Sequence, residues 1–214
     1  MKPLIVTGTD TGIGKTIVSA MLALALDGFY WKPIQAGIAD GTDRGRVAAL
    51  TGFSPARLLA GRYVLREPLS PHRAAEIDGV TIKLANLDLP EVPEGRHLIV
   101  EGAGGVLVPI NRAALQVDLF LRWNAPAVLV ARTALGTINH TLLSLEALRA
   151  RAIPVLGIVF VGEAMEDSEK TIADFGQVKR LGRLPHLSQL NANTLRAAFE
   201  ANFAARDFEA AHAG

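Results

Sequence analysis

The sequence contains no cysteine, no long apolar run and almost no net charge, and each absence excludes a class of protein. Without cysteine there is no disulfide framework, thiolate zinc site, iron–sulfur cluster or cysteine nucleophile. No run of about 18 apolar residues could span a bilayer, and the apolar start at residues 4–6 is too short for a signal peptide. A formal net charge of +1 gives no electrostatic footprint for nucleic acid or an anionic membrane. We therefore expect a cytoplasmic enzyme with neither nucleic acid nor membrane as a partner.

The composition and the order of the apolar segments predict the fold class. A hydrophobic content of 50% and a charged content of 20% are typical of a globular protein, and 214 residues suit one α/β domain over residues 1–214. Apolar strand-like runs alternate with helical patterns, and no repeat, low-complexity tract or linker interrupts them. This alternation predicts a mostly parallel sheet with helices on both faces.

Residues 3–19 carry the most informative pattern, in which an apolar run ends in a glycine-rich loop and a helix follows. The glycines of the loop are Gly8, Gly12 and Gly14. Such a loop cradles phosphate with its N–H groups and with the N-terminus of the helix, so we predict a P-loop NTPase-like fold. Lys15 would then reach the β- and γ-phosphates, and the Thr16 hydroxyl would bind Mg²⁺. Five residues separate the first glycine from the last, where the strict pattern has four, and an ordinary glycine-rich turn is the alternative.

The periodicity of the remaining chain predicts further elements. The first helix should run from Lys15 to Asp27 and stop at Gly28, and a strand at residues 29–32 should lie beside the first strand. Pro71 should begin a short helix, and residues 82–89 are interpreted as another. In the last helix, Leu195, Phe199 and Phe203 should share one apolar face in the core. Further strands are expected at residues 98–100, 127–131, 155–161 and 178–184, and further helices at residues 47–50, 115–123, 137–151 and 167–175.

Lys32 and Asp43 follow the second expected strand. Because Pro33 bars further central pairing, Lys32 should project from the carboxyl end of the sheet, where open α/β sheets bind ligands. A surface lysine is an equally open interpretation. Asp43 either caps the next helix together with Thr42 or directs its carboxylate to Mg²⁺, and its position alone favours the cap.

Two later segments are also candidates for a site at this edge. Glu101 ends an apolar strand and precedes a glycine cluster, so its carboxylate could reach the metal directly or through water. Residues 135–139 form another strand-to-helix turn whose N–H groups could hold an anion, with plain helix capping as the alternative. His72 lies in the turn that starts the short helix, where a satisfied or exposed histidine is commoner than a catalytic one.

Together these segments resemble the dethiobiotin synthetases. The matching motifs are TGTDT and GKT within residues 7–16, KPIQ at 32–35, TD at 42–43, EPLSPH at 67–72, VEGAGG at 100–105 and LGTINH at 135–140. The resemblance extends from residue 4 to about residue 187. It implies an ATP- and Mg²⁺-dependent ring closure in biotin biosynthesis, with 7,8-diaminopelargonate, CO₂ and ATP as substrates. Two anions, a carbamate and a triphosphate, must meet in this reaction, and cations have to lie between them.

The resemblance also implies roles for individual residues. Lys32 and Lys15 would be catalytic, with Lys32 stabilising the carbamate and its phosphorylated form, and Mg²⁺ would be held by Thr16, Asp43 and Glu101. Substrate would be bound by Thr11, Lys32, Ala36, Gly136, Thr137 and Asn139, the last contributed across a homodimer interface. Nucleotide would be bound by Gly12, Ile13, Gly14, Lys15, Thr16, Ile17, Asp43, Glu101, Gly102, Ala103, Gly104, Pro185, His186 and Leu187.

Three positions depart from the pattern of the family. Ala36 stands where a hydroxyl side chain is frequent, so one hydrogen bond to substrate is missing or supplied by water. Val161 and Gly162 replace an Asn that reads the adenine, and Arg183 interrupts the Gly-x-Ile-Pro stretch bordering the base pocket. We therefore expect weak discrimination among nucleoside triphosphates.

Two related kinds of phosphate-loop protein are alternatives. A partitioning or positioning ATPase usually has a second lysine early in the loop, where this chain has Gly8-Thr9-Asp10. A cobyric-acid-type amidotransferase needs a glutaminase domain with a cysteine nucleophile, which neither the length nor the composition of this chain allows unless a separate subunit supplies ammonia.

Overall fold

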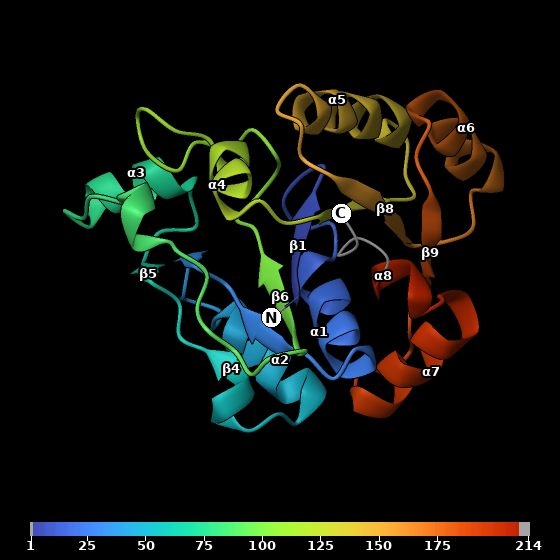
Figure 1. The fold of residues 1–214 in the computed structure, drawn as a ribbon, viewed down its shortest axis with the longest axis horizontal. Coiled ribbons are helices and arrows are strands. Elements are labelled where there is room, and N and C mark those ends of the chain that lie inside the picture. The colour runs from blue at the N-terminus through green and yellow to red at the C-terminus, as the bar shows by residue number, and fades with distance from the viewer. Residues whose placement is uncertain (1, 210–214) are drawn as a thin grey trace.

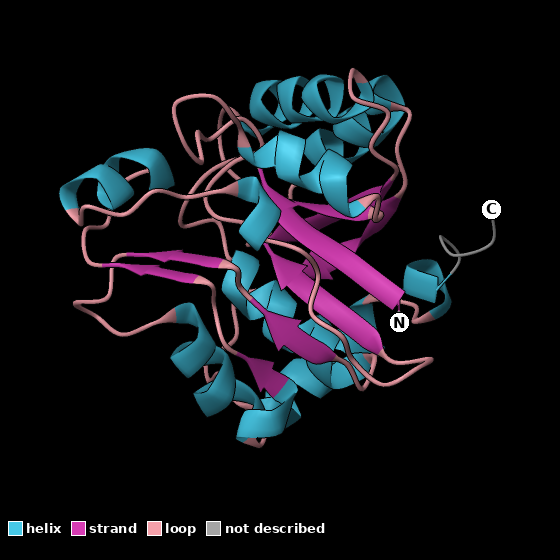
Figure 2. Cartoon of the chain, turned by 60° about the vertical axis from the view of Figure 1, so that its left-hand side comes forward, coloured by secondary structure: helices cyan, strands magenta, loops and turns pink. Residues whose placement is uncertain are grey.

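A computed structural model describes residues 2–209 and contains a seven-stranded sheet with the order β4-β2-β6-β1-β7-β8-β9 (Figure 1). Every pairing of these strands is parallel. Two further short strands, β3 (Ile34–Ala36) and β5 (Tyr63–Leu65), pair in parallel apart from the main sheet (Figure 2). The strands of the main sheet are β1 (Lys2–Gly8), β2 (Phe29–Trp31), β4 (Leu58–Leu59), β6 (His97–Glu101), β7 (Ala127–Arg132), β8 (Val155–Val161) and β9 (Arg180–Leu184).

Helices cover both faces of the main sheet, as predicted (Figure 2). One face packs against α1 (Lys15–Ala25), α2 (Asp43–Thr51) and α7 (Ala192–Asn202). The other face packs against α4 (Gln116–Trp123), α5 (Thr137–Arg149) and α6 (Glu166–Gly176). The remaining helical elements are α3 (Pro71–Ile77), α8 (Arg206–Glu209) and two 3₁₀ turns at Pro55–Arg57 and Leu84–Asn86.

The central strands show why their sequence is apolar at consecutive positions. Leu4 and Val6 of β1 face the core under α1, whereas Ile5 faces the core under α4 and α5. Alternate residues of a strand point to opposite faces, so a strand buried on both sides needs apolar residues throughout. The predicted α/β class with a parallel sheet is therefore confirmed.

The last helix also packs as predicted. Leu195 and Phe199 are buried in the core under α1, while Phe203 follows the end of α7 and stacks on Phe199 at a centroid distance of 5.5 Å. Phe208 of α8 completes this aromatic group. The predicted apolar face therefore belongs to the core.

Strand order differs from the prediction that β2 lies beside β1. β6 lies between them and pairs with both, Val6 opposite Glu101 on one side and Trp31 opposite Val100 on the other. Hydrophobic periodicity carries no information on which strands become neighbours. The difference matters for function, because it places the end of β6 between the phosphate loop and the end of β2.

Two local predictions were also wrong. The first helix ends at Ala25, two residues before the predicted end at Asp27, and Asp27 takes the left-handed conformation, with φ 47°. The Gly28 N–H closes the turn on the Ala23 carbonyl at 2.9 Å, and a Cβ at this glycine would lie 3.2 Å from His97. Gly28 thus provides space for close packing.

Residues 82–89 do not form the predicted α-helix. They contain one 3₁₀ turn, in which Leu87 N–H bonds to the Leu84 carbonyl at 3.0 Å. The Lys83 N–H, just before this turn, donates to the Tyr63 hydroxyl at 3.1 Å.

Two predictions concern the chain as a whole. No helix within residues 2–209 has the length and apolar character needed to cross a membrane. The prediction of one domain over residues 1–214 includes residue 1 and residues 210–214, which lie outside the described part of the chain.

Candidate active site

The loop between β1 and α1 has the backbone conformation of a phosphate cradle. Gly14 is the N-cap of α1 with φ 98°, in the left-handed region that side chains disfavour. At Gly8 a Cβ would lie 2.4 Å from Ile13 Cδ1, so a larger residue here would displace the Ile13 side chain that packs under the loop. The first N–H groups of α1 are therefore directed toward the carboxyl edge of the sheet, where an anion could accept their hydrogen bonds.

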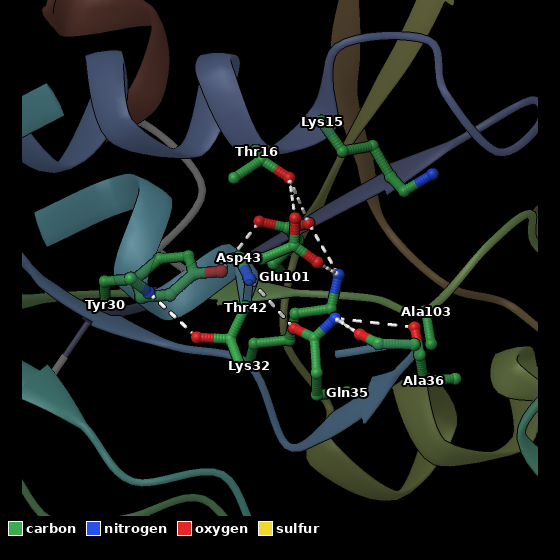
Figure 3. Close-up of polar contacts among 12 residues, drawn as sticks. Lys15, Thr16, Tyr30, Lys32, Gln35, Ala36, Thr42, Asp43, Glu101 and Ala103 are labelled. Carbon is green, nitrogen blue, oxygen red and sulfur yellow. Dashed lines mark hydrogen bonds and ion pairs between the residues drawn. The ribbon is translucent and has the colours of Figure 1, made fainter. Parts of the chain in front are cut away.

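Lys15 is the first residue of α1 and lies across this loop. Its Nζ donates to the Asp10 carbonyl at 2.6 Å, and the residue is only 6% exposed. Burial lowers the pKa of Lys15 from 10.5 to about 8, because desolvation of the ammonium outweighs the attraction of the nearby carboxylates. Figure 3 shows its ammonium directed away from Asp43 and Glu101.

Four side chains from four different elements meet beside the loop (Figure 3). The Thr16 hydroxyl of α1 lies 2.8 Å from Asp43 Oδ1 and 2.9 Å from Glu101 Oε1. The ammonium of Lys32, just after β2, lies 2.9 Å from Glu101 Oε1 and pairs also with Asp43 Oδ2. Trp31 pairs with Val100, so the next residue of each strand brings Lys32 and Glu101 together.

Asp43 directs its carboxylate into this cluster and does not cap α2. Thr42 is the N-cap, and its Oγ1 accepts from the Gly45 N–H at 3.1 Å. The Gln35 Oε1 accepts from the Asp43 N–H at 3.0 Å and so ties the start of the helix to the end of β3. Of the two interpretations of Asp43, the geometry therefore favours the carboxylate facing the site.

The charges of the cluster stabilise one another. Burial acts to lower the pKa of Lys32, but Glu101 and Asp43 outweigh it and raise the pKa. Burial acts to raise the pKa of Asp43, but Lys32 and the Thr16 hydroxyl outweigh it and lower the pKa. Lys32 therefore stays an ammonium and Asp43 a carboxylate across the neutral range.

The donor set of the cluster suits a hard divalent cation. Two carboxylates and one hydroxyl converge within hydrogen-bond distance of one another, and all are oxygen donors. In residues 2–209 no group of three His, Asp or Glu side chains forms a complete protein cage. Mg²⁺ commonly uses one or two carboxylates and completes its shell with water and phosphate, so the residues fit this ion.

A cavity of ≈ 470 Å³ opens over the loop and the cluster. Of the predicted site residues, it is lined by Thr11, Gly12, Gly14, Lys15, Thr16, Ile17, Lys32, Ala36, Asp43, Glu101, Ala103 and Gly104. Sequence reasoning gave no role to several further lining residues, which are Arg46, Pro68, Leu69, Ser70, Pro71 and Val108. Arg46 lies one turn after Asp43 on α2, a spacing that could have indicated it.

Eight predicted residues do not line the cavity of the single chain. Ile13 is buried against Gly8, and Gly102 donates its N–H to the Val6 carbonyl at 3.0 Å. The other six are near the carboxyl ends of β7 and β9, and they are Gly136, Thr137, Asn139, Pro185, His186 and Leu187. His72 does not line this cavity either. Its Nδ1 lies 3.0 Å from the Ser70 hydroxyl, which agrees with the interpretation of a histidine with a hydrogen-bond partner and no catalytic role.

Arg183 is held at the end of β9 by two groups. Its Nη1 donates to the Gly162 carbonyl at 3.2 Å, and its Nε lies 3.3 Å from Glu169 Oε1. Glu169 is buried in α6 and also pairs with Arg180 at 2.7 Å. The Arg183 side chain, which departs from the family pattern, is thus fixed near Val161, whose methyl groups lie 3.1 Å and 3.4 Å from the place that a Cβ at Gly14 would take.

Curated relatives match nearly the whole chain. The ATP-dependent dethiobiotin synthetase BioD of Rhodopseudomonas palustris (strain HaA2) is 61% identical over 97% of this chain and 96% of its own length. The chain belongs to the dethiobiotin synthetase family. A second synthetase of this name, from Novosphingobium aromaticivorans, is 56% identical over 97% of this chain and 100% of its own. This membership confirms the predicted family. It supports neither the partitioning ATPase nor the cobyric-acid-type amidotransferase.

Comparisons at lower similarity support the fold of this synthetase. A family model described as an AAA domain matches residues 2–194. The cell division ATPase MinD of Pyrococcus furiosus superposes with a TM-score of 0.57, at 15% identity, over 98% of this chain and 99% of its own. At that identity the likeness concerns the fold alone, which is the predicted P-loop class.

Proposed function

We propose that the cavity closes the ureido ring of dethiobiotin from 7,8-diaminopelargonate, CO₂ and ATP. One amine adds to CO₂ and gives up a proton, which forms a carbamate. A carbamate oxygen then attacks the γ-phosphorus and ADP leaves, which gives a carbamic–phosphoric anhydride. The second amine attacks the carbonyl carbon, the carbon–oxygen bond to phosphate breaks, and ring, phosphate and a proton are released.

The observation that carries this proposal is the convergence of two ammonium groups and a phosphate loop in one cavity. Lys15 and Lys32 both line it, and the first turn of α1 closes one side. A carbamate and a triphosphate repel each other, and cations held in place beforehand remove most of that barrier in a partly buried site. No protein nucleophile is needed, because close approach of the amine, CO₂ and the phosphate supplies the remainder.

The cluster at Thr16, Asp43 and Glu101 would hold Mg²⁺. When bound, this ion would neutralise charge on the β- and γ-phosphates during transfer. Lys32 would remain beside the two carboxylates and present its ammonium to the carbamate oxygens. Thr11 and Ala36 also line the cavity and would contact the diamine.

We place the far end of the substrate in a homodimer. Gly136 and Asn139, at the start of α5, are exposed and outside the cavity of one chain. Leu135 beside them is fully exposed, which is unusual for a large apolar residue unless another surface covers it. The N-terminus of α5 in a second copy would therefore bind the substrate carboxylate through its free N–H groups.

The test is to incubate the protein with Mg²⁺, ATP, bicarbonate and 7,8-diaminopelargonate and to follow dethiobiotin by mass. Lys32→Ala should abolish ring formation and leave nucleotide binding within about twofold, because phosphates are bound mainly by the loop. Lys83→Ala is the matched control, since Lys83 is exposed and outside the cavity. Normal turnover by Lys32→Ala would refute this assignment.

A further inference from the structure

The two oxygens of the Glu101 carboxylate have different surroundings. Oε1 faces the cavity, where Thr16 Oγ1 and Lys32 Nζ each lie 2.9 Å away. Oε2 faces the interior and accepts a hydrogen bond of 2.9 Å from the Tyr30 hydroxyl (Figure 3). The side chain of Glu101 is only 1% exposed, so its carboxylate is largely shielded from bulk solvent.

The sheet register brings Tyr30 to this oxygen. Tyr30 lies in β2 opposite Ile99 of β6, and Glu101 is two residues further along the same face of β6. The tyrosine is fully buried beneath α1, and its hydroxyl reaches along that face to the carboxylate. Lys32 follows Tyr30 by two residues, so β2 delivers both the hydroxyl and the ammonium to Glu101.

A carboxylate held at one oxygen can no longer rotate freely about its last bond. Without the Tyr30 hydroxyl, Oε2 would be a buried, charged acceptor without its donor, and the group would turn to share the remaining donors. We propose that Tyr30 is a positioning residue, whose hydroxyl holds Glu101 so that Oε1 faces the metal-binding side of the cavity. This inference rests on the proposed metal site at Thr16, Asp43 and Glu101.

The alternative role for Tyr30 is to fill space in the core, which needs its ring and not its hydroxyl. Tyr30→Phe separates the two roles, because phenylalanine keeps the ring. The chain has one other tyrosine, Tyr63, whose hydroxyl accepts from Lys83 N–H and Asn86 Nδ2 at 3.1 Å each, outside the cavity. Tyr63→Phe therefore removes the same atom elsewhere and is the matched control.

The experiment measures binding of Mn²⁺ to the protein saturated with a non-hydrolysable ATP analogue, through the paramagnetic signal of the free ion. Groups that orient a metal ligand are worth about 10- to 100-fold in metal affinity, so Tyr30→Phe should weaken binding by that factor. Tyr63→Phe should bind Mn²⁺ like the unchanged protein. In turnover, Tyr30→Phe should raise the Mg²⁺ concentration for half-maximal rate and leave the KM of the diamine unchanged.

A double-mutant cycle tests whether the effect passes through Glu101. In a Glu101→Gln background, Tyr30→Phe should change the Mn²⁺ affinity by less than about twofold. An equal effect in both backgrounds, or no effect of Tyr30→Phe alone, would overturn the inference. If Glu101→Gln itself left the Mn²⁺ affinity unchanged, the metal site of the proposed function would be refuted. The positioning role of Tyr30 would then be refuted as well.

A second measurement keeps Tyr30 in place, so its outcome does not depend on whether Tyr30→Phe folds. In Tyr63→Phe protein, Tyr30 is the single tyrosine, so a ¹³C label at its Cζ reports this hydroxyl alone. Its chemical shift should move on adding Mg²⁺ with the ATP analogue, and it should move on introducing Glu101→Gln. A shift that responds to neither change would refute the positioning role.

Discussion

The pKa of Lys15 predicts how nucleotide binding depends on pH. Its ammonium is buried without a carboxylate partner, and its pKa falls from 10.5 to about 8. A bound triphosphate would supply the missing negative charge and restore the ammonium. From about pH 7 to about pH 9 the protonated fraction of a group with this pKa falls from about 0.9 to about 0.1, so the affinity for ATP should fall about tenfold.

Stability of the free protein should change in the opposite direction. Above about pH 8 the unfolded chain keeps the Lys15 proton that the folded chain has lost, so the free energy of unfolding rises with pH up to about 10.5. The full difference corresponds to about 3 kcal/mol. Stabilisation by ATP should therefore shrink with rising pH while the nucleotide-free protein gains stability.

Calorimetric titration with a non-hydrolysable ATP analogue in buffers of different ionisation enthalpy measures the proton taken up on binding. We expect about 0.9 proton per site at about pH 9 and about 0.1 at about pH 7. Lys15→Arg is the control, because its guanidinium stays charged and every other titrating group is kept. Proton uptake near zero at pH 9, or the same uptake by Lys15→Arg, would refute the reasoning.

Three further predictions concern the rest of the cavity and its surroundings. With Val161 and Arg183 near the loop, turnover with CTP and GTP should be within about tenfold of turnover with ATP, and a strong preference for ATP would show that other groups read the base. If the proposed homodimer forms, Leu135→Asp should dissociate it in light scattering and raise the KM of the diamine more than that of ATP, whereas a monomeric unchanged protein would contradict the proposal. Arg46→Ala should raise the KM of ATP about two- to fivefold, as an exposed charge contact would, and an unchanged KM would exclude Arg46 from the phosphate site.

The sequence was sufficient to predict those features that depend on neighbouring residues. The glycines that shape the phosphate loop, the apolar strands and the placement of Lys32 and Glu101 at strand ends all follow from local spacing. Helix ends were less certain, because the first helix ends at Ala25 and Asp27, which is not a glycine, takes the left-handed conformation after it.

Features that depend on long-range pairing could not be predicted in the same way. Periodicity places β6 in the sheet but does not place it between β1 and β2, and the parallel pair β3 and β5 has no separate signal. The contact of Tyr30 with Glu101 needs the register of two strands 71 residues apart. Arg46 gains a place at the cavity only when α2 packs beside α1.

Lys15 and Lys32 have different charge partners in the folded protein, which the sequence alone does not indicate. Lys32 meets Asp43 and Glu101, so its burial is compensated before any substrate arrives, and its pKa rises. Lys15 meets a backbone carbonyl, so its burial is uncompensated, and its pKa falls. Without nucleotide, Lys32 therefore stays charged beside the carboxylates, whereas Lys15 has no negatively charged partner within residues 2–209. A triphosphate on the loop is the group whose charge would supply that partner, and this difference couples the charge of Lys15 to nucleotide binding while the charge of Lys32 stays fixed.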